Sequence, residues 1–126
     1  MVTIPVSVGE LIDKLSILQV KKIKITNDEA LKYVSKEFEL LYSQSETYFQ
    51  VSELKSLYES LTEVNSTLWD VEDKLRVFES EKKFDQEFIE LARKVYYTND
   101  ERFRLKNEIN SITSSEIREV KDYKPY

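Results

Sequence analysis

Eight apolar residues separated by alternating steps of three and four constrain this chain more than any other feature. An α-helix turns once every 3.6 residues, so this spacing places all eight side chains on one stripe. A stripe of this length needs an apolar partner along the whole helix, as in a coiled coil. The spacing predicts a long helix over residues 52–81 that carries Leu54, Leu57, Leu61, Val64, Leu68, Val71, Leu75 and Phe78.

A second stripe follows after a short break and supplies the partner. Lys82 to Phe84 predict a tight turn, and Asp85 is a good N-cap for a helix over residues 85–113. Two long helices joined by a short turn lie antiparallel and side by side. The second stripe consists of Phe84, Phe88, Leu91, Val95, Thr98, Arg102, Leu105, Ile109 and Ile112.

Two shorter helices are predicted before this hairpin. Ser7 and Glu10 have the spacing of a capping box and predict a helix over residues 8–25. Asn27 is a good N-cap for a second helix over residues 28–42. Further along the chain, Ser52 is a candidate cap for the first long helix.

Together these elements predict an all-α fold in which two shorter helices pack on a long antiparallel hairpin, as in a helical bundle. We expect one domain over residues 1–126, with residues 1–6 as an extended arm and residues 114–126 as a partly flexible tail. A hairpin of this length, roughly 42 Å, is longer than a compact domain of this size. Either the monomer is elongated or two hairpins share a core, and we expect a homodimer.

The composition excludes several classes of function. The chain has 19 basic and 24 acidic residues, and the net charge of −5 argues against nucleic-acid binding and against docking on anionic lipid. It has no Cys, no His and a single Gly, which excludes thiolate or imidazole chemistry and a glycine-rich phosphate loop. No apolar run is long enough to cross a membrane. We therefore expect a cytoplasmic protein without membrane insertion.

Polar residues interrupt the apolar stripe near the middle of the hairpin. On the first long helix one flank carries Asn65, Trp69, Glu72 and Arg76 at steps of four, three and four. On the second, Asn99, Arg102 and Lys106 occupy the stripe or its edge, and an antiparallel register places Asn65 opposite Asn99. The first short helix brings Asp13 and Lys14 to the edge of its own apolar stripe.

Two interpretations of these polar residues remain open. Polar groups in a helical seam often set register and pairing. They can also form a ligand pocket, in which Arg102 and Lys106 hold an anion and the two Asn side chains orient it. The candidate ligand-binding set is Asn65, Trp69, Glu72, Arg76, Asn99, Arg102, Lys106, Asp13 and Lys14.

Catalytic and metal sites have little support in the sequence. Acidic pairs three residues apart are no more frequent than chance predicts for a chain with this many acids. We expect no cofactor, with Mg²⁺ on Glu72 or Asp13 only if the pocket binds a nucleotide or sugar nucleotide. No residue is identified as catalytic, and whether the protein is an enzyme stays open.

Three segments resemble an uncharacterised family of small bacterial proteins. They are residues 4–14 (IPVSVGELIDK), 65–73 (NSTLWDVED) and 96–102 (YYTNDER), and the resemblance extends over nearly the whole chain. None of these strings is a catalytic signature. Some family members resemble proteins encoded beside genes for lipopolysaccharide or other surface-glycan synthesis, so the resemblance implies an association with glycan assembly.

Two main hypotheses follow for the function. The first is a non-enzymatic helical interaction or accessory protein, linked through the resemblance to surface-glycan synthesis. The alternative is an enzyme or binder of a small anionic metabolite, such as a nucleotide or sugar nucleotide, in the polar cluster. The family association also suggests a regulatory module for a glycan-synthesis enzyme.

Overall fold

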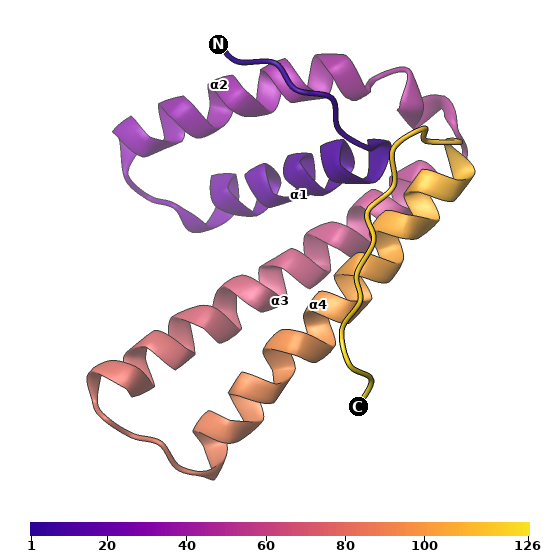
Figure 1. The fold of residues 1–126 in the computed structure, drawn as a ribbon. Coiled ribbons are helices and arrows are strands. Elements are labelled where there is room, and N and C mark those ends of the chain that lie inside the picture. The colour runs from indigo at the N-terminus through magenta and orange to yellow at the C-terminus, as the bar shows by residue number, and fades with distance from the viewer.

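A computed structural model describes all residues from 1 to 126 and contains helices but no strands. The helices are α1 (Val8–Lys24), α2 (Asp28–Ser45), α3 (Leu54–Ser80) and α4 (Gln86–Ile112), with a short 3₁₀ turn, η1 (Tyr48–Gln50), before α3 (Figure 1). The predicted all-α bundle is confirmed. The predicted helix bounds differ from these by at most three residues, and the largest difference is the end of α2, which continues to Ser45.

Three predicted N-caps begin their helices as expected. Each cap side chain accepts a hydrogen bond from the backbone N–H three residues later, which satisfies a donor that the helix itself leaves free. The bonds are Glu10 N to Ser7 Oγ at 3.0 Å, Ala30 N to Asn27 Oδ1 at 2.9 Å, and Phe88 N to Asp85 Oδ1 at 3.2 Å.

The predicted cap of α3 is wrong. Glu53, not Ser52, occupies the N-cap position, and neither side chain caps the helix. The backbone supports the first turn instead, because the carbonyl of Val51 accepts from Leu54 N at 3.1 Å. The chain enters α3 through the η1 turn, so the local backbone, which the sequence pattern did not reveal, replaces a side-chain cap.

The turn between α3 and α4 follows a common helix-ending geometry. Lys82 has a φ of 55°, the left-handed conformation that often follows a helix. Its N–H donates to the carbonyl of Glu79 at 3.1 Å, and Lys83 N donates to the carbonyl of Phe78 at 2.9 Å. The tight turn expected here is therefore present, and it reverses the chain into α4.

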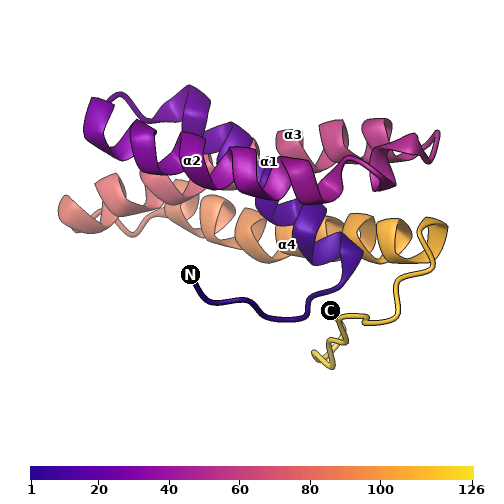
Figure 2. The same cartoon turned by 90° about the horizontal axis from the view of Figure 1, so that it is seen from above.

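The helices form three layers. The antiparallel α3–α4 hairpin is the base, α1 lies over it and contacts both of its helices, and α2 packs on α1 without substantial contact to α3 or α4 (Figures 1 and 2). The expectation that both short helices pack on the hairpin therefore holds directly for α1, whereas α2 is an outer layer. The main core lies between α1 and the hairpin and contains Val8, Ile12, Leu54, Leu61, Leu105 and Ile109.

Gly9 sets the close approach between the start of α1 and the end of α4. Its backbone nitrogen donates to Oδ1 of Asn110 at 2.7 Å, and Asn110 is completely buried. A Cβ atom on residue 9 would lie 2.5 Å from the carbonyl oxygen of Lys106, closer than real Cβ atoms come to other atoms. The only glycine of the chain thus stands where two helices meet too closely for any side chain.

The two terminal segments run along the same side of the bundle, outside the helices (Figure 2). The arm, residues 1–6, has no regular structure and is exposed. The tail runs back along α4 (Figure 1), where Lys121 lies 5.4 Å from the ring centre of Phe103 and the Tyr126 hydroxyl donates to Asp100. No helix combines the length and the apolar character that crossing a bilayer requires.

Candidate ligand cleft between α1, α3 and α4

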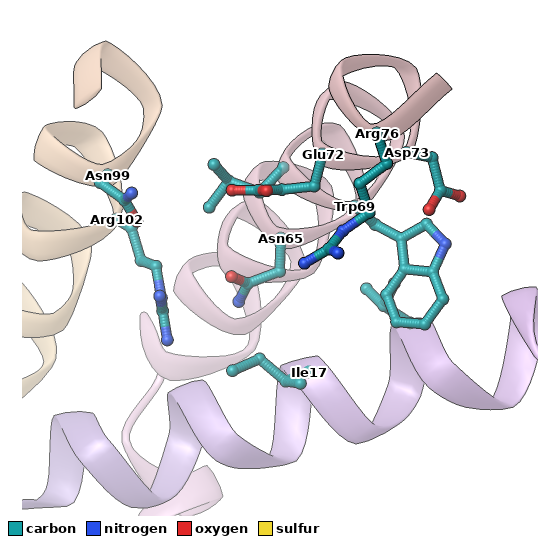
Figure 3. Close-up of a pocket in the computed structure, with 10 residues that line it drawn as sticks. Ile17, Asn65, Trp69, Glu72, Asp73, Arg76, Asn99 and Arg102 are labelled. Carbon is teal, nitrogen blue, oxygen red and sulfur yellow. The ribbon is translucent and has the colours of Figure 1, made fainter. Parts of the chain in front are cut away.

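A cleft of about 450 Å³ lies between α1 and the two helices of the hairpin. Six of the nine candidate residues line it: Asn65, Trp69, Glu72 and Arg76 from α3, and Asn99 and Arg102 from α4. In Figure 3, Asn65, Glu72 and Arg76 extend toward Asn99 and Arg102, whereas Trp69 points away from α4. Ile17 of α1 lies below them. The other lining residues are Ile17, Val20, Leu68 and Asp73.

Helical geometry explains why α3 supplies four of these side chains. Positions separated by three or four residues lie on the same face of a helix, and the polar flank of α3 follows that spacing. The polar flank borders the opening between α1 and α4. Arg102 comes from the part of α4, about two turns long, where Thr98 and Arg102 interrupt the apolar stripe.

An ion pair between Asp13 and Arg102 joins α1 to α4 at the edge of the cleft. Arg102 Nε donates to Asp13 Oδ1 at 2.9 Å, and Nη2 donates to Oδ2 at 2.6 Å. Asp13 is completely buried, whereas the Arg102 side chain is 28% exposed. This bidentate contact raises the pKa of Arg102 above its ordinary value, since the hydrogen bonds to Asp13 outweigh the opposing effect of burial.

Asn65 and Ser16 complete the polar network around Asp13. Asn65 Nδ2 donates to Asp13 Oδ1 at 3.0 Å and approaches Ser16 Oγ at 2.8 Å. The Ser16 hydroxyl donates to the backbone carbonyl of Asp13 at 2.6 Å. A buried carboxylate is costly unless it is paired and hydrogen-bonded, and here both conditions hold.

Several polar groups in the cleft have no protein partner. Arg102 uses Nε and Nη2 for Asp13, and its Nη1 has no protein acceptor. The side chain of Asn99 makes no hydrogen bond, and Arg76 forms no ion pair although Glu72 lies one turn away. The cleft therefore offers unused donors beside the indole of Trp69.

The charges that line the cleft balance. Arg76 and Arg102 contribute two positive charges, and Glu72 and Asp73 contribute two negative ones. Arg102 is further neutralised by Asp13 behind it. This inventory suits a ligand with a limited negative charge and several hydrogen-bonding groups better than it suits a polyphosphate.

The other two candidate residues lie outside the cleft. Lys106 is nearly buried, and its Nζ lies 2.9 Å from Glu10 Oε2 and 2.6 Å from Glu119 Oε2, so it ties the tail to α1. Lys14 is on the opposite side of α1, where its Nζ lies 3.6 Å from Glu37 Oε2 on α2. The spacing on α4 predicted that Lys106 lies in the cleft with Arg102. The tail covers Lys106 instead, and the position of the tail could not be predicted because its sequence has no helical pattern.

The sequence interpretation missed four lining residues and one network residue. Ile17, Val20 and Leu68 are apolar, and an apolar residue on a helix gives no signal that it borders a cleft. Ser16 follows Asp13 by three positions, so it could have been placed on the same helical face. Asp73 is next to Glu72 in the sequence, but it does not share the spacing of the polar flank.

The acidic side chains in and around the cleft are few. Asp13 lies beneath the cleft and is engaged with Arg102, which leaves Glu72 and Asp73 as the acidic side chains on its surface. No group of three or more acidic side chains in the structure is arranged to hold a metal ion.

Fold and site together define an all-helical protein with a mixed-charge cleft between its first helix and a long hairpin. The chain belongs to a family of unknown function (DUF6165), whose model matches residues 2–126. Searches of the curated proteins and of the solved structures found no match to this chain. The family match therefore supports the sequence resemblance over almost the whole chain but assigns no activity.

Proposed function

We propose that this protein is a non-enzymatic accessory protein that binds a small anionic metabolite in the cleft between α1, α3 and α4. The observation that carries the proposal is the position of Arg102. Its guanidinium is oriented by two hydrogen bonds to Asp13, while Nη1 has no protein partner. An arginine held in this way can bind an anionic group without losing much side-chain entropy on binding.

The other free groups of the cleft complement such a ligand. Arg76 adds a second cation, Asn99 can donate or accept, and the carboxylates of Glu72 and Asp73 can accept from hydroxyl groups. The Trp69 indole offers an apolar surface for a ring. The volume of about 450 Å³ lies within the range of about 300–1,000 Å³ typical of small-ligand sites.

These features favour a ligand with one or two negative charges and several hydroxyl groups, such as a sugar phosphate or a sugar nucleotide. The balanced lining charges disfavour more highly charged ligands. The link to surface-glycan synthesis that the sequence resemblance implies would agree with this ligand class. An accessory protein of a glycan-synthesis enzyme could respond to such a metabolite.

We propose binding without catalysis because the one buried carboxylate beside the cleft is already engaged. Both oxygens of Asp13 accept hydrogen bonds, from Arg102 and in one case also from Asn65. Asp13 is also completely buried and does not line the cleft, so a substrate there cannot reach it in this arrangement. With no Cys or His in the chain, the cleft has no nucleophile paired with a base.

Trp69 is the only tryptophan and lines the cleft, so its fluorescence reports directly on binding. We would titrate the protein with glucose 1-phosphate and with UDP-glucose, each with and without Mg²⁺, and follow Trp69 emission and the melting temperature. We expect saturable binding that does not need Mg²⁺. Ligand at 100 times its dissociation constant stabilises the folded state by about 2.7 kcal/mol, which a melting curve detects.

A matched pair of variants tests where the ligand binds. Arg76→Gln removes an unpaired cation from the cleft, whereas Lys74→Gln removes an exposed cation from α3 outside it. We expect the dissociation constant to rise about tenfold or more for Arg76→Gln and to change little for Lys74→Gln. The proposal fails if neither compound at millimolar concentration changes the emission or the melting temperature, or if both variants weaken binding equally.

A further inference from the structure

The turn end of the α3–α4 hairpin, residues 77–90, has no cover from the other helices. Lys24, the last residue of α1, bonds to Asp70 of α3 at 2.9 Å, and Figure 1 shows the hairpin diverging from α1 toward its turn. No hydrogen bond, ion pair or aromatic contact joins residues 77–90 to α1 or α2. The end therefore consists of two helices that cover only each other.

The apolar stripes continue into this uncovered end. Phe78 and Phe88 are only half-buried, and Phe84 is 53% exposed. Leu54 and Leu61, at the other end of the α3 stripe, are by contrast completely buried under α1. Val77 and Ile89 add further exposed apolar surface. Two helices alone cannot enclose an apolar stripe, because each contacts its partner on one side only. A third or fourth helix is needed to bury it.

The total surface of the chain is large enough to accommodate one further interface. The structure exposes 8753 Å², whereas a folded monomer of 15.0 kDa is expected to expose about 7,000 Å². The extended arm and tail supply part of the excess, and the hairpin end is the part where a helical apolar stripe is open. A standard protein interface removes about 800 Å² from each partner, which is well within this excess.

We propose that a second copy of this chain packs its hairpin end on this one, so that the two hairpins form a four-helix bundle around a twofold axis. A twofold arrangement uses the same surface on both copies and closes after two subunits. It would supply the two missing helices at once and bury Phe78, Phe84 and Phe88 of both copies. This surface is separate from the core around α1 and does not depend on a ligand in the cleft.

The charge of the hairpin end predicts how the dimer responds to salt. Residues 77–90 contain five acidic and two basic residues, a net charge of −3. Two copies repel each other at low ionic strength, and salt screens this repulsion while the apolar contact remains. We expect added sodium chloride to strengthen the dimer, whereas a basic partner protein on this surface would bind less tightly in salt.

The test is the mass of the full chain in solution, measured by sedimentation or light scattering over a range of concentrations. We expect a mass of about twice 15.0 kDa. Phe84→Glu and Val77→Glu each place a charge in the proposed interface at a residue that is more than half exposed in the monomer. Both should raise the dimer dissociation constant by about thirtyfold or more.

Tyr33→Glu is the matched control, since Tyr33 is a 72% exposed aromatic residue on α2, away from the hairpin. It should leave the dimer intact, and circular dichroism should show all three variants folded. A wild-type chain that stays monomeric at every concentration would overturn the proposal. So would a dimer that both hairpin variants leave unchanged, because the copies would then meet through another surface.

Discussion

Asp13 and Arg102 lie 89 residues apart in the chain and form a bidentate ion pair that joins α1 to α4. Asp13 is completely buried, and its carboxylate accepts hydrogen bonds from Arg102 and from Asn65. The pair therefore has two roles. It holds the first helix on the hairpin, and it orients the arginine that borders the cleft.

Replacing Arg102 and Asn99 by leucine should have contrasting effects. Arg102→Leu leaves the Asp13 carboxylate buried without a cation, and we expect a loss of about 3–5 kcal/mol in the free energy of unfolding. Asn99 makes no hydrogen bond in the structure and is half-exposed, so Asn99→Leu should change stability by less than about 1 kcal/mol. Urea unfolding of the two variants measures both values.

The double variant Asp13→Leu, Arg102→Leu checks this explanation. Removing both charges eliminates the unpaired carboxylate, so the double variant should recover most of the stability that Arg102→Leu loses. If it is no more stable than Arg102→Leu, packing around the arginine rather than its charge accounts for the loss.

Gly9→Ala should destabilise the protein, although alanine normally favours a helix over glycine by roughly 0.5–1 kcal/mol. The new Cβ would lie 2.5 Å from the Lys106 carbonyl and 2.9 Å from Asn110 Oδ1, so α1 and α4 must move apart. We expect a loss of about 1–3 kcal/mol, measured by chemical unfolding. A gain in stability would show that the helices can separate at little cost.

Lys106 should make stability depend on pH in the alkaline range. Burial lowers the pKa of Lys106, but hydrogen bonds to Glu119 and Glu10 outweigh it, so the pKa lies above the ordinary 10.5. The folded state thus holds this proton more tightly than the unfolded state. The resulting stabilisation is complete below 10.5 and is lost as the pH rises through the folded-state pKa.

Comparing the pH dependence of the free energy of unfolding between the parent and Lys106→Met isolates the contribution of Lys106. Unfolding measured at a series of alkaline pH values should show a steeper loss of stability for the parent than for the variant. Equal slopes for the two proteins would mean that Lys106 does not contribute to the alkaline transition.

Tyr126 should ionise later than an ordinary tyrosine. Its hydroxyl donates to Asp100, and this bond raises the pKa of Tyr126 to about 12 from the usual 10.0. The difference between spectrophotometric titrations of the parent and Tyr126→Phe gives the value directly. Asp100→Asn removes the negative acceptor, so in that background the Tyr126 pKa should return toward 10.0.

The helices and much of the cleft could be predicted from spacing alone. The steps of three and four along α3 and α4 placed the apolar stripes on facing sides, and the same steps placed Asn65, Trp69, Glu72 and Arg76 on one flank. The antiparallel register followed from the short turn. Six candidate residues consequently line one cleft in the structure.

The spacing of residues along a helix could not predict the surroundings of side chains that contact non-helical segments or helices distant in the sequence. Lys106 has the same period as Arg102 but is covered by Glu119 of the tail, and Lys14 faces α2 instead of the hairpin. The start of α3 shows the same limit, because the η1 turn replaced the expected cap. The surroundings of these residues depend on contacts between segments that are far apart in the sequence, and such contacts leave no periodic pattern in it.

The sequence by itself determined the helices, their turns and which faces are apolar, because these depend on interactions between residues within four positions of one another. The tertiary structure alone decided that α1, and not α2, covers the hairpin. It also decided that two donors of Arg102 bind Asp13 and are not free for a ligand. A buried carboxylate needs a cation wherever the fold brings one near it. Helical period cannot show which cation that is, since the choice depends on how two helices cross in space.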